Sequence, residues 1–295
     1  MNGFVNEFKN YLINEKKSSA NTVESYNRDI EKFINYCNIT TLKNISNINP
    51  DFIKKYSSYM LNSGQSEASV ARTYASLRCY FKFLNNIGVI ENNPMKNISS
   101  NHTTKKLPEI LTNKEVLKLL NQPDGNDFKS CRDKAMLELL YATGIKVSEL
   151  ISLKVSDINL NIGLLHMHSP KNERIIPIYP EAVKCISKYI NNVRSVMVTN
   201  ADVEFLFTNM NGQPMTRQGF WKIIKQYAAL AKIKKDITPH TLRHSFAAHL
   251  LENGAQLTDI KEMLGHADIS STQVYAQIMK NKYVSAYKKF HPMAR

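Results

Sequence analysis

Apolar residues recur three and four positions apart along most of this 295-residue chain, and this helical spacing is the feature that most constrains its fold. Four such runs fill the first 97 residues, and no alternating apolar and polar stretch separates them. Residues 20–22 supply an N-cap candidate for one run, and Ser66 opens the last. Asn49 and Pro50 form a cap and first-turn pair for the third run, which precedes the run that Ser66 opens. We therefore predict that this part of the chain is entirely helical.

One stretch further on breaks the helical pattern. Residues 163–180 (GLLHMHSPKNERIIPIYP) alternate and are rich in β-branched residues about a polar turn, which predicts a small hairpin. A short helix that leads into a strand precedes it, and residues 204–216 predict a further strand and turn. After Arg217 we predict helices with breaks only at Gly254 and Gly265. The predicted fold class is mainly α with a small antiparallel β-sheet (α+β).

A polar segment separates the two patterns. Residues 92–110 contain two prolines and have no apolar period, which is typical of an interdomain linker. We predict a helical N-terminal domain over residues 1–97, a linker over 98–108 and a second domain over 109–295.

Composition argues against several classes of protein. The chain has no long apolar run and no signal-peptide pattern at its start, so we predict a cytosolic protein without a membrane partner. Its cysteines form no CxxC pair, which argues against a disulfide framework or a thiolate zinc site. We expect buried, reduced thiols at all four positions, which are Cys37, Cys79, Cys131 and Cys185.

The charge points to a polyanionic partner. The formal net charge is +14, with 12 basic and 8 acidic residues in the first 97 positions and 27 and 17 in the remainder. Because both parts are basic, the balance fits nucleic acid contacted by two domains better than a basic tail on a neutral enzyme.

The stretch TPHTLRHSFAAHLLENG, residues 238–254, raises the question of a metal site or an anion site. His240 and His244 are four apart, as in a zinc-binding helix, whereas His240 and Arg243 are three apart and could bind an anion together. The glutamate of an HExxH motif is absent, and an arginine stands between the two histidines and would repel a dication.

The predicted start of this helix decides the question. Thr238 is a good N-cap and Pro239 a good first residue, so His240 falls in the first turn. A helix N-terminus attracts anions and disfavours cations. We therefore predict an anion site without a metal or a cofactor, in which His244 and His249 have supporting or packing roles.

The order and spacing of further residues resemble a known family. His240-x-x-Arg243 is followed by Leu264-Gly265-His266 and then by Tyr275, as in the second conserved box of the tyrosine recombinases. LLYATGIKVSEL resembles their first box and PKNERIIP the hairpin between the boxes. The resemblance covers the whole chain and is strongest to the Xer branch. It implies a C-shaped clamp made of a core-binding domain and a catalytic domain.

The resemblance also implies the chemistry and the residues that carry it. Tyr275 would attack a DNA phosphodiester and form a 3′-phosphotyrosyl link, which a second strand's 5′-hydroxyl reverses without ATP or metal. Arg243, His240 and His266 would bind the phosphate or assist proton movement. Lys171, in a turn that is shorter than the family's, would be the general acid for the leaving oxygen.

One position departs from the family's pattern. Lys146 stands where the family has its first catalytic arginine, and lysine keeps the charge but lacks the bidentate fork. Either the natural enzyme uses a lysine here or the residue was replaced to trap DNA complexes, and we favour replacement. Glu149 lies three residues on and could orient residue 146.

The resemblance further implies a working assembly. Strand exchange through a Holliday junction needs four active sites on two duplexes, hence a homotetramer or a heterotetramer with a second recombinase, with a DNA translocase as a candidate regulator. The implied role is chromosome or plasmid dimer resolution. Two alternatives stay open, namely an integrase or resolvase of a mobile element and a DNA-binding regulator with a decayed active site. Residues 280–295 could dock as a terminal helix on a neighbouring protomer or pack on their own domain.

Overall fold

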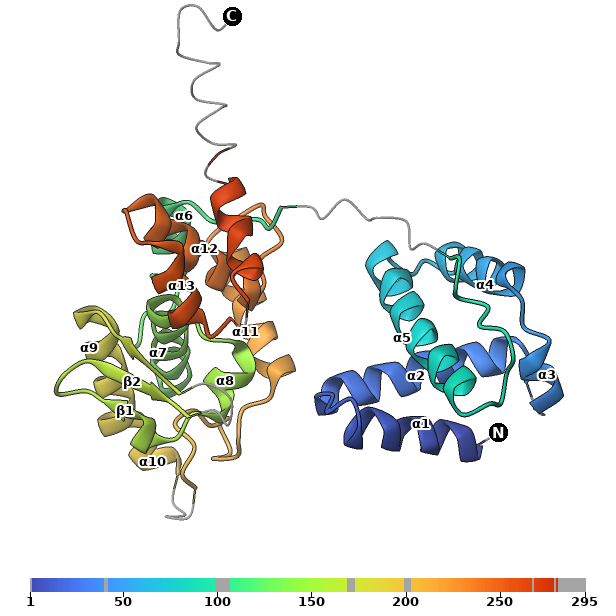
Figure 1. Ribbon diagram of the computed structural model, residues 1–295. Helices are drawn as coiled ribbons and strands as arrows, with labels where there is room; N and C mark the ends of the chain where they lie inside the picture. Colours follow the sequence, from blue (N-terminus) through green and yellow to red (C-terminus); the bar gives the residue numbers. More distant parts are fainter. Residues whose placement is uncertain are drawn as a thin grey trace, which may run out of the picture. The chain divides into compact units, whose positions relative to one another are not determined.

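The chain divides into two compact units, Met1–Lys105 and Lys106–Arg295, which are described separately here. Figure 1 draws their elements in the computed structural model. The structure describes residues 2–39, 42–98, 107–168, 173–198, 203–266, 268–278 and 280. Within these residues, no helix combines the length and the apolar character that crossing a bilayer requires.

The N-terminal unit contains helices joined by turns and no strand within its described residues, as predicted. Its elements are α1 (Asn2–Asn14), α2 (Ala20–Tyr36), α3 (Leu42–Ser46), α4 (Pro50–Asn62) and α5 (Glu67–Asn86). Aromatic rings fill its core, where Phe8 meets Tyr80 edge-on at a ring-centroid distance of 5.1 Å and Phe33 packs on Phe81 at 5.9 Å. The aromatic stripes of the sequence therefore form the core of this unit.

The capping predictions hold for two of these helices and fail for one. The Asn49 side chain accepts the backbone N–H groups of Asp51 and Phe52, and the Ser66 hydroxyl accepts that of Ser69. The N-cap of α2 is Ser19, which accepts from Thr22, and not a residue in 20–22. Ser19 takes this position because its extended backbone lets its hydroxyl face the first turn.

The C-terminal unit combines helices with one small sheet (Figure 1). Its helices are α6 (Asn113–Leu120), α7 (Phe128–Thr143), α8 (Val147–Ser152), α9 (Pro180–Tyr189), α10 (Ser195–Met197), α11 (Arg217–Leu230), α12 (Pro239–Glu252) and α13 (Leu257–Leu264). A 3-10 turn (Val155–Asp157) precedes the sheet, a π-helical turn (Ile190–Arg194) follows α9, and residues 270–278 are helical.

The sheet contains the predicted hairpin. Its strands β1 (Ile158–Asn159), β2 (Leu164–Met167) and β3 (Arg174–Pro177) are antiparallel and lie in the order β1-β2-β3. Leu165 on β2 pairs with Ile176 on β3, and both side chains are fully buried, so this face of the sheet joins the core. The mainly α fold with a small antiparallel sheet is confirmed.

Three predictions are wrong in detail. Residues 204–216 form isolated bridges and not a strand, because the Asn209 side chain accepts N–H groups of its own turn and closes the backbone on itself. Residues 231–238 add a break after Arg217, since α11 ends at Leu230. Of the cysteines only Cys131 is buried; Cys37, Cys79 and Cys185 lie at partly exposed positions on their elements.

Helix α7 is the central element of the C-terminal unit and lies between α9 and α12 (Figure 1). Twelve of its 16 residues are buried, so it is covered on nearly every side. It ends, as predicted, at Gly144, which has a left-handed φ of 60° and whose N–H donates to the carbonyl of Leu140. A Cβ at Gly144 would overlap the ring of Phe246 on α12 and lie 3.0 Å from Leu264.

We therefore expect Gly144→Ala to destabilise this unit by about 2–4 kcal/mol, combining left-handed strain with overpacking. Gly254→Ala is the matched control, because Gly254 also has a left-handed φ (95°) but has open space around its Cβ position. Its cost should be about 1–2 kcal/mol. Urea unfolding followed by the fluorescence of Trp221, the chain's single tryptophan, measures both, and equal costs would contradict the close packing at Gly144.

Candidate active site

The predicted anion site lies at the N-terminus of α12. The Thr238 hydroxyl accepts the backbone N–H of Thr241, and Pro239 occupies the first turn, as predicted. This start places His240 at the surface, Arg243 in the interior with 4% of its surface exposed, and His244 at a half-buried position. The cap therefore determines which faces of the helix the site residues occupy.

Arg243 joins two segments that are far apart in the sequence. Its guanidinium donates from Nη1 to the carbonyl of Gly144 (2.6 Å) and from Nη2 to the carbonyl of Leu264 (2.8 Å). These carbonyls belong to the C-terminal ends of α7 and α13, where unpaired carbonyls favour a cation. The Gly144 end leads to Lys146 and the Leu264 end leads to His266, so one guanidinium brings both motifs to α12.

Lys146 stands at the N-cap position of α8. Its backbone N–H donates to Oε2 of Glu149 (2.7 Å), while its side chain is exposed. Its charge lies close enough to His240 and His266 to contribute to the lowered pKa of both. Glu149 thus contacts residue 146 through the backbone, which fixes where the side chain begins.

Arg174, at the start of β3, is a site residue that the sequence analysis did not single out. Its guanidinium donates from Nη2 to Glu149 (2.9 Å) and from Nε to the carbonyl of Met263 (2.9 Å), and 8% of its side chain is exposed. It also packs on Gly265, where an added Cβ would lie 2.5 Å from Nη1. Arg174 therefore ties the hairpin to α8 and to the end of α13. The available signal was an arginine at the entry of a strand that otherwise alternates.

The histidines of the site are held in their neutral forms. Burial, followed by the charges of Arg243 and Lys146, lowers the pKa of His266 to about 4. Partial loss of solvent around the ring and the same two charges lower the pKa of His240, although part of its surface is exposed. Nδ1 of His266 lies 3.0 Å from the hydroxyl of the buried Thr272, which orients the ring. Near pH 7 each ring can therefore donate one N–H and offer one acceptor nitrogen.

Tyr275 lies on the helical segment 270–278 with 1% of its surface exposed. Its hydroxyl is 2.9 Å from Nδ1 of His244. Burial raises the pKa of Tyr275, and the positive charge of Arg243 opposes the rise. The structure thus brings Tyr275 to the helix of Arg243 and His240, and it places His244, which the sequence analysis assigned to a supporting or packing role, beside the tyrosine hydroxyl.

Part of the predicted site lies outside the described residues. Lys171 lies outside them, between β2 and β3 in the sequence, as do residues 99–106 of the predicted linker and 281–295 at the C-terminus.

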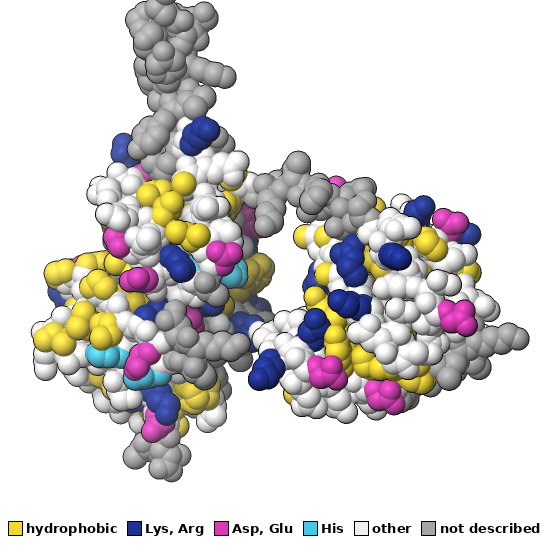
Figure 2. Space-filling view, in the orientation of Figure 1, with side chains coloured by type: hydrophobic (Ala, Val, Ile, Leu, Met, Phe, Trp, Pro, Cys, Tyr) yellow, Lys and Arg dark blue, Asp and Glu magenta, His cyan; other side chains and the backbone are white. Residues whose placement is uncertain are grey.

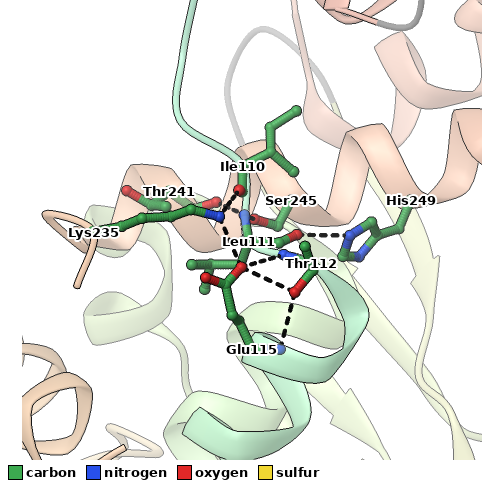
Figure 3. A network of polar contacts seen from close by, with 8 residues as sticks. All are labelled: Ile110, Leu111, Thr112, Glu115, Lys235, Thr241, Ser245 and His249. Atoms are coloured by element: carbon green, nitrogen blue, oxygen red, sulfur yellow. Dashed lines mark hydrogen bonds and ion pairs between the residues drawn. The ribbon is translucent and has the colours of Figure 1, made fainter. Parts of the chain in front are cut away.

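A polar network fixes α12 to the segment that follows the linker (Figure 3). His249 contacts the carbonyl of Leu111 through Nε2 (2.9 Å), and the Ser245 hydroxyl accepts the N–H of Leu111 (2.9 Å). Lys235, just before α12, donates to the carbonyl of Ile110 (2.9 Å) and to Glu115 (2.7 Å). His249 therefore has the predicted packing role, and this network holds α12 against the segment at the start of its unit.

Comparisons with known proteins cover both units. The model of the phage integrase family matches residues 109–282, and that of the phage integrase N-terminal SAM-like domain matches residues 5–87. Tyrosine recombinase XerD of Halalkalibacterium halodurans is 43% identical over 296 residues, which cover 100% of this chain and 99% of that protein. Tyrosine recombinase XerD of Listeria monocytogenes is 42% identical, with 100% of each chain covered.

Solved structures show the same fold. The XerH site-specific recombinase bound to a palindromic difH substrate matches with a TM-score of 0.77 at 21% identity, over 96% of this chain and 84% of that one. The XerA recombinase matches with a TM-score of 0.56 at 24% identity, over 99% of both chains.

Proposed function

The chain belongs to the phage integrase family and is a tyrosine recombinase similar to XerD over its whole length, and from this premise we propose how it cuts and rejoins DNA. Tyr275 attacks a phosphodiester of duplex DNA and forms a 3′-phosphotyrosyl intermediate, and strand exchange passes through a Holliday junction. The proposal is carried by the contacts that α12 makes. Arg243 on this helix binds the carbonyls of Gly144 and Leu264, and His244 on the same helix contacts the hydroxyl of Tyr275.

Each proposed role follows from the donors that a side chain can offer. Arg243 uses two of its five N–H donors on carbonyls, and the others would bind phosphate oxygens as charge develops in the transition state. His240 and neutral His266 would donate ring N–H groups to the same oxygens. Lys171 is proposed as the general acid for the leaving 5′-oxygen, and Lys146 as the cation in place of the family's first arginine.

Glu149 and Arg174 would act on these groups indirectly. Their ion pair fixes the backbone of Lys146 and the end of α13 ahead of His266. Because the phosphotyrosyl bond conserves the energy of the broken bond, the proposed reaction needs no nucleotide and no metal.

The proposed DNA partner is held by both units. We assign residues 1–97 to the core-binding domain, 98–108 to the linker and 109–295 to the catalytic domain, and propose that the two domains close as a clamp on duplex DNA. Figure 2 shows Lys and Arg side chains on the visible faces of both units, and both parts of the chain are net basic. A basic surface of this kind attracts the phosphate backbone.

The proposed assembly is a tetramer on two duplexes, made of this chain alone or with a second recombinase, and licensed by a DNA translocase. In the cytoplasm it would resolve chromosome or plasmid dimers, a role that the whole-length similarity to XerD supports. An integrase or resolvase of a mobile element is the alternative within the class.

The test of the proposed function is a covalent adduct. Sequencing the DNA that stays attached to the protein in cells gives the target site, and a nicked suicide duplex of that site then traps cleavage. The chain carrying Lys146→Arg should form the adduct in EDTA. An adduct that requires a divalent ion would overturn the proposed chemistry. If no DNA stays attached to the protein in cells and no nicked duplex gives an adduct, a DNA-binding regulator is favoured.

DNA affinity should depend steeply on salt. Each phosphate neutralised by Lys or Arg lowers the logarithm of the affinity by about 0.9 per log unit of salt. With several contacts per protomer, tenfold more salt should weaken binding by roughly 10³-fold or more. Fluorescence anisotropy of a labelled duplex between 50 and about 500 mM salt measures the slope, with a scrambled duplex as the non-specific reference. A nearly flat slope would argue against an extensive phosphate interface.

A further inference from the structure

The nucleophile has a hydrogen-bond partner to which the proposed function gives no role. Nδ1 of His244 lies 2.9 Å from the Tyr275 hydroxyl, and the two ring centroids are 5.7 Å apart with their planes at 52°. His244 follows Arg243 directly on α12, a helix held at its start by a cap and along its length by the network around Leu111. The imidazole therefore sits on a rigid element and faces the reacting oxygen.

We propose that His244 is a further catalytic residue, whose Nδ1 accepts the Tyr275 hydroxyl proton during attack and returns it during rejoining. This inference rests on the proposed function, because it gives the nucleophile of that reaction its base. His244 is not among the residues that are proposed to bind phosphate oxygens, which are Arg243, His240 and His266.

The donors around the hydroxyl determine which group can take its proton. The charged or titratable groups that act on Tyr275 and His244 are Arg243 and His240 on α12, and the His266 ring beyond α13 also lies close enough to His244 to interact with it electrostatically. Arg243 carries only donors and cannot accept a proton. The imidazole in contact with the hydroxyl can accept one when its own proton is on Nε2.

The protonation states fit this assignment. Burial, then the neighbouring His240 and Arg243, lower the pKa of His244 to about 4, so its ring is neutral near pH 7 and has a free lone pair. Burial raises the pKa of Tyr275, so the hydroxyl keeps its proton until attack and needs an acceptor at that moment. A phosphate in the site would bring negative charge that offsets the cost of an imidazolium beside Arg243.

The proton balance closes over a full cycle. During cleavage the bond from Oη to phosphorus forms, the bond from phosphorus to O5′ breaks, and the Tyr275 proton moves to Nδ1 of His244. The leaving O5′ takes a proton from a separate donor, for which Lys171 is proposed. During rejoining a 5′-hydroxyl attacks phosphorus, its proton returns to that donor, and His244 gives its proton back to Oη.

The test is single-turnover cleavage by the full chain carrying Lys146→Arg, with and without His244→Ala. We expect His244→Ala to slow cleavage by about 10²-fold near pH 7, the usual effect of losing a general base. The deficit should shrink as pH rises toward the tyrosine pKa, because solvent then generates the tyrosinate. A 5′-bridging phosphorothiolate, whose sulfur leaves without a proton, should relieve loss of the leaving-group acid but not loss of His244.

Two further variants separate catalysis from structure. His244→Gln keeps a side chain that can hydrogen-bond but cannot accept a proton near pH 7, so it should be about as slow as His244→Ala. His249 is also a buried histidine on this helix, but it contacts Leu111. His249→Gln should therefore keep the pH profile of the Lys146→Arg chain. Duplex binding and the unfolding midpoint verify that each variant is folded, and if His244→Ala does not fold, the glutamine variant decides.

The possible outcomes are distinct. Cleavage by His244→Gln at the parental rate would mean that the hydrogen bond only positions the tyrosine, and cleavage by His244→Ala at or above the parental rate would mean that the bond restrains a resting state. Either result would overturn the inference and leave the proposed function intact. If the Lys146→Arg chain that keeps His244 (the parental chain of this test) forms no adduct, or if the adduct does not need Tyr275, the proposed function itself is overturned.

Discussion

Tyr275→Phe is expected to abolish the covalent protein–DNA adduct while DNA binding stays within a few-fold of the parental value. The change removes one oxygen and leaves the ring in its buried position. Loss of the hydroxyl bonded to His244 should cost about 1 kcal/mol of stability, too little to unfold the unit. Loss of a covalent nucleophile typically lowers the rate by about 10⁴- to 10⁶-fold, so the adduct should be undetectable in denaturing gels.

Tyr141→Phe is the matched control for this change. The Tyr141 hydroxyl also contacts a histidine nitrogen, Nδ1 of His249 at 2.8 Å, but this histidine contacts the carbonyl of Leu111 and not the Tyr275 hydroxyl. It should therefore keep the adduct while losing a comparable hydrogen bond. If Tyr275→Phe still formed the adduct in EDTA, another residue would be the nucleophile and the proposed reaction would be wrong.

Local signals carried most of the helical fold. Thr238 and Pro239 predict the start of α12, and Gly144 and Gly265 predict the ends of α7 and α13, because caps act within one turn of the chain. The strand predicted over residues 204–216 is wrong because a local side-chain contact there overrides the apolar pattern. Their apolar pattern is that of a strand, but the side chain of Asn209 closes the backbone into a turn.

The site residues that belong to a family motif could be predicted from their spacing in the sequence. Those that are placed only by tertiary contacts could not. The contact of Arg174 with Met263 spans 89 residues, and that of His244 with Tyr275 spans 31. Neither partner is marked by periodicity or by a cap, because the first contact joins β3 to α13 and the second joins α12 to the helical segment 270–278. His244 in particular follows the arginine of the motif, where an imidazole on a partly buried face has packing as its default role.

Lys146→Arg is expected to accelerate cleavage by at least about ten-fold, equivalent to about 1.4 kcal/mol of transition-state stabilisation. A guanidinium presents a planar fork that can bind two phosphate oxygens, which an ammonium cannot do. The surroundings favour the change, because Glu149 already pairs with Arg174 and with the backbone of residue 146, and the side chain there is exposed. An arginine would therefore keep its fork available for phosphate, and the chain's affinity for duplex DNA should change little.

Lys154→Arg provides the matched control. Lys154 is also the N-cap of a short helix, and its backbone N–H donates to a carboxylate three residues on, that of Asp157, at 2.8 Å. Its ammonium, however, pairs with Glu204 outside the site. Its arginine variant should cleave at the parental rate. Single-turnover rates on one nicked duplex compare the three proteins. Equal rates for lysine and arginine at position 146 would mean that this pocket is shaped for an ammonium, so that the lysine is a native adaptation and not a replaced arginine.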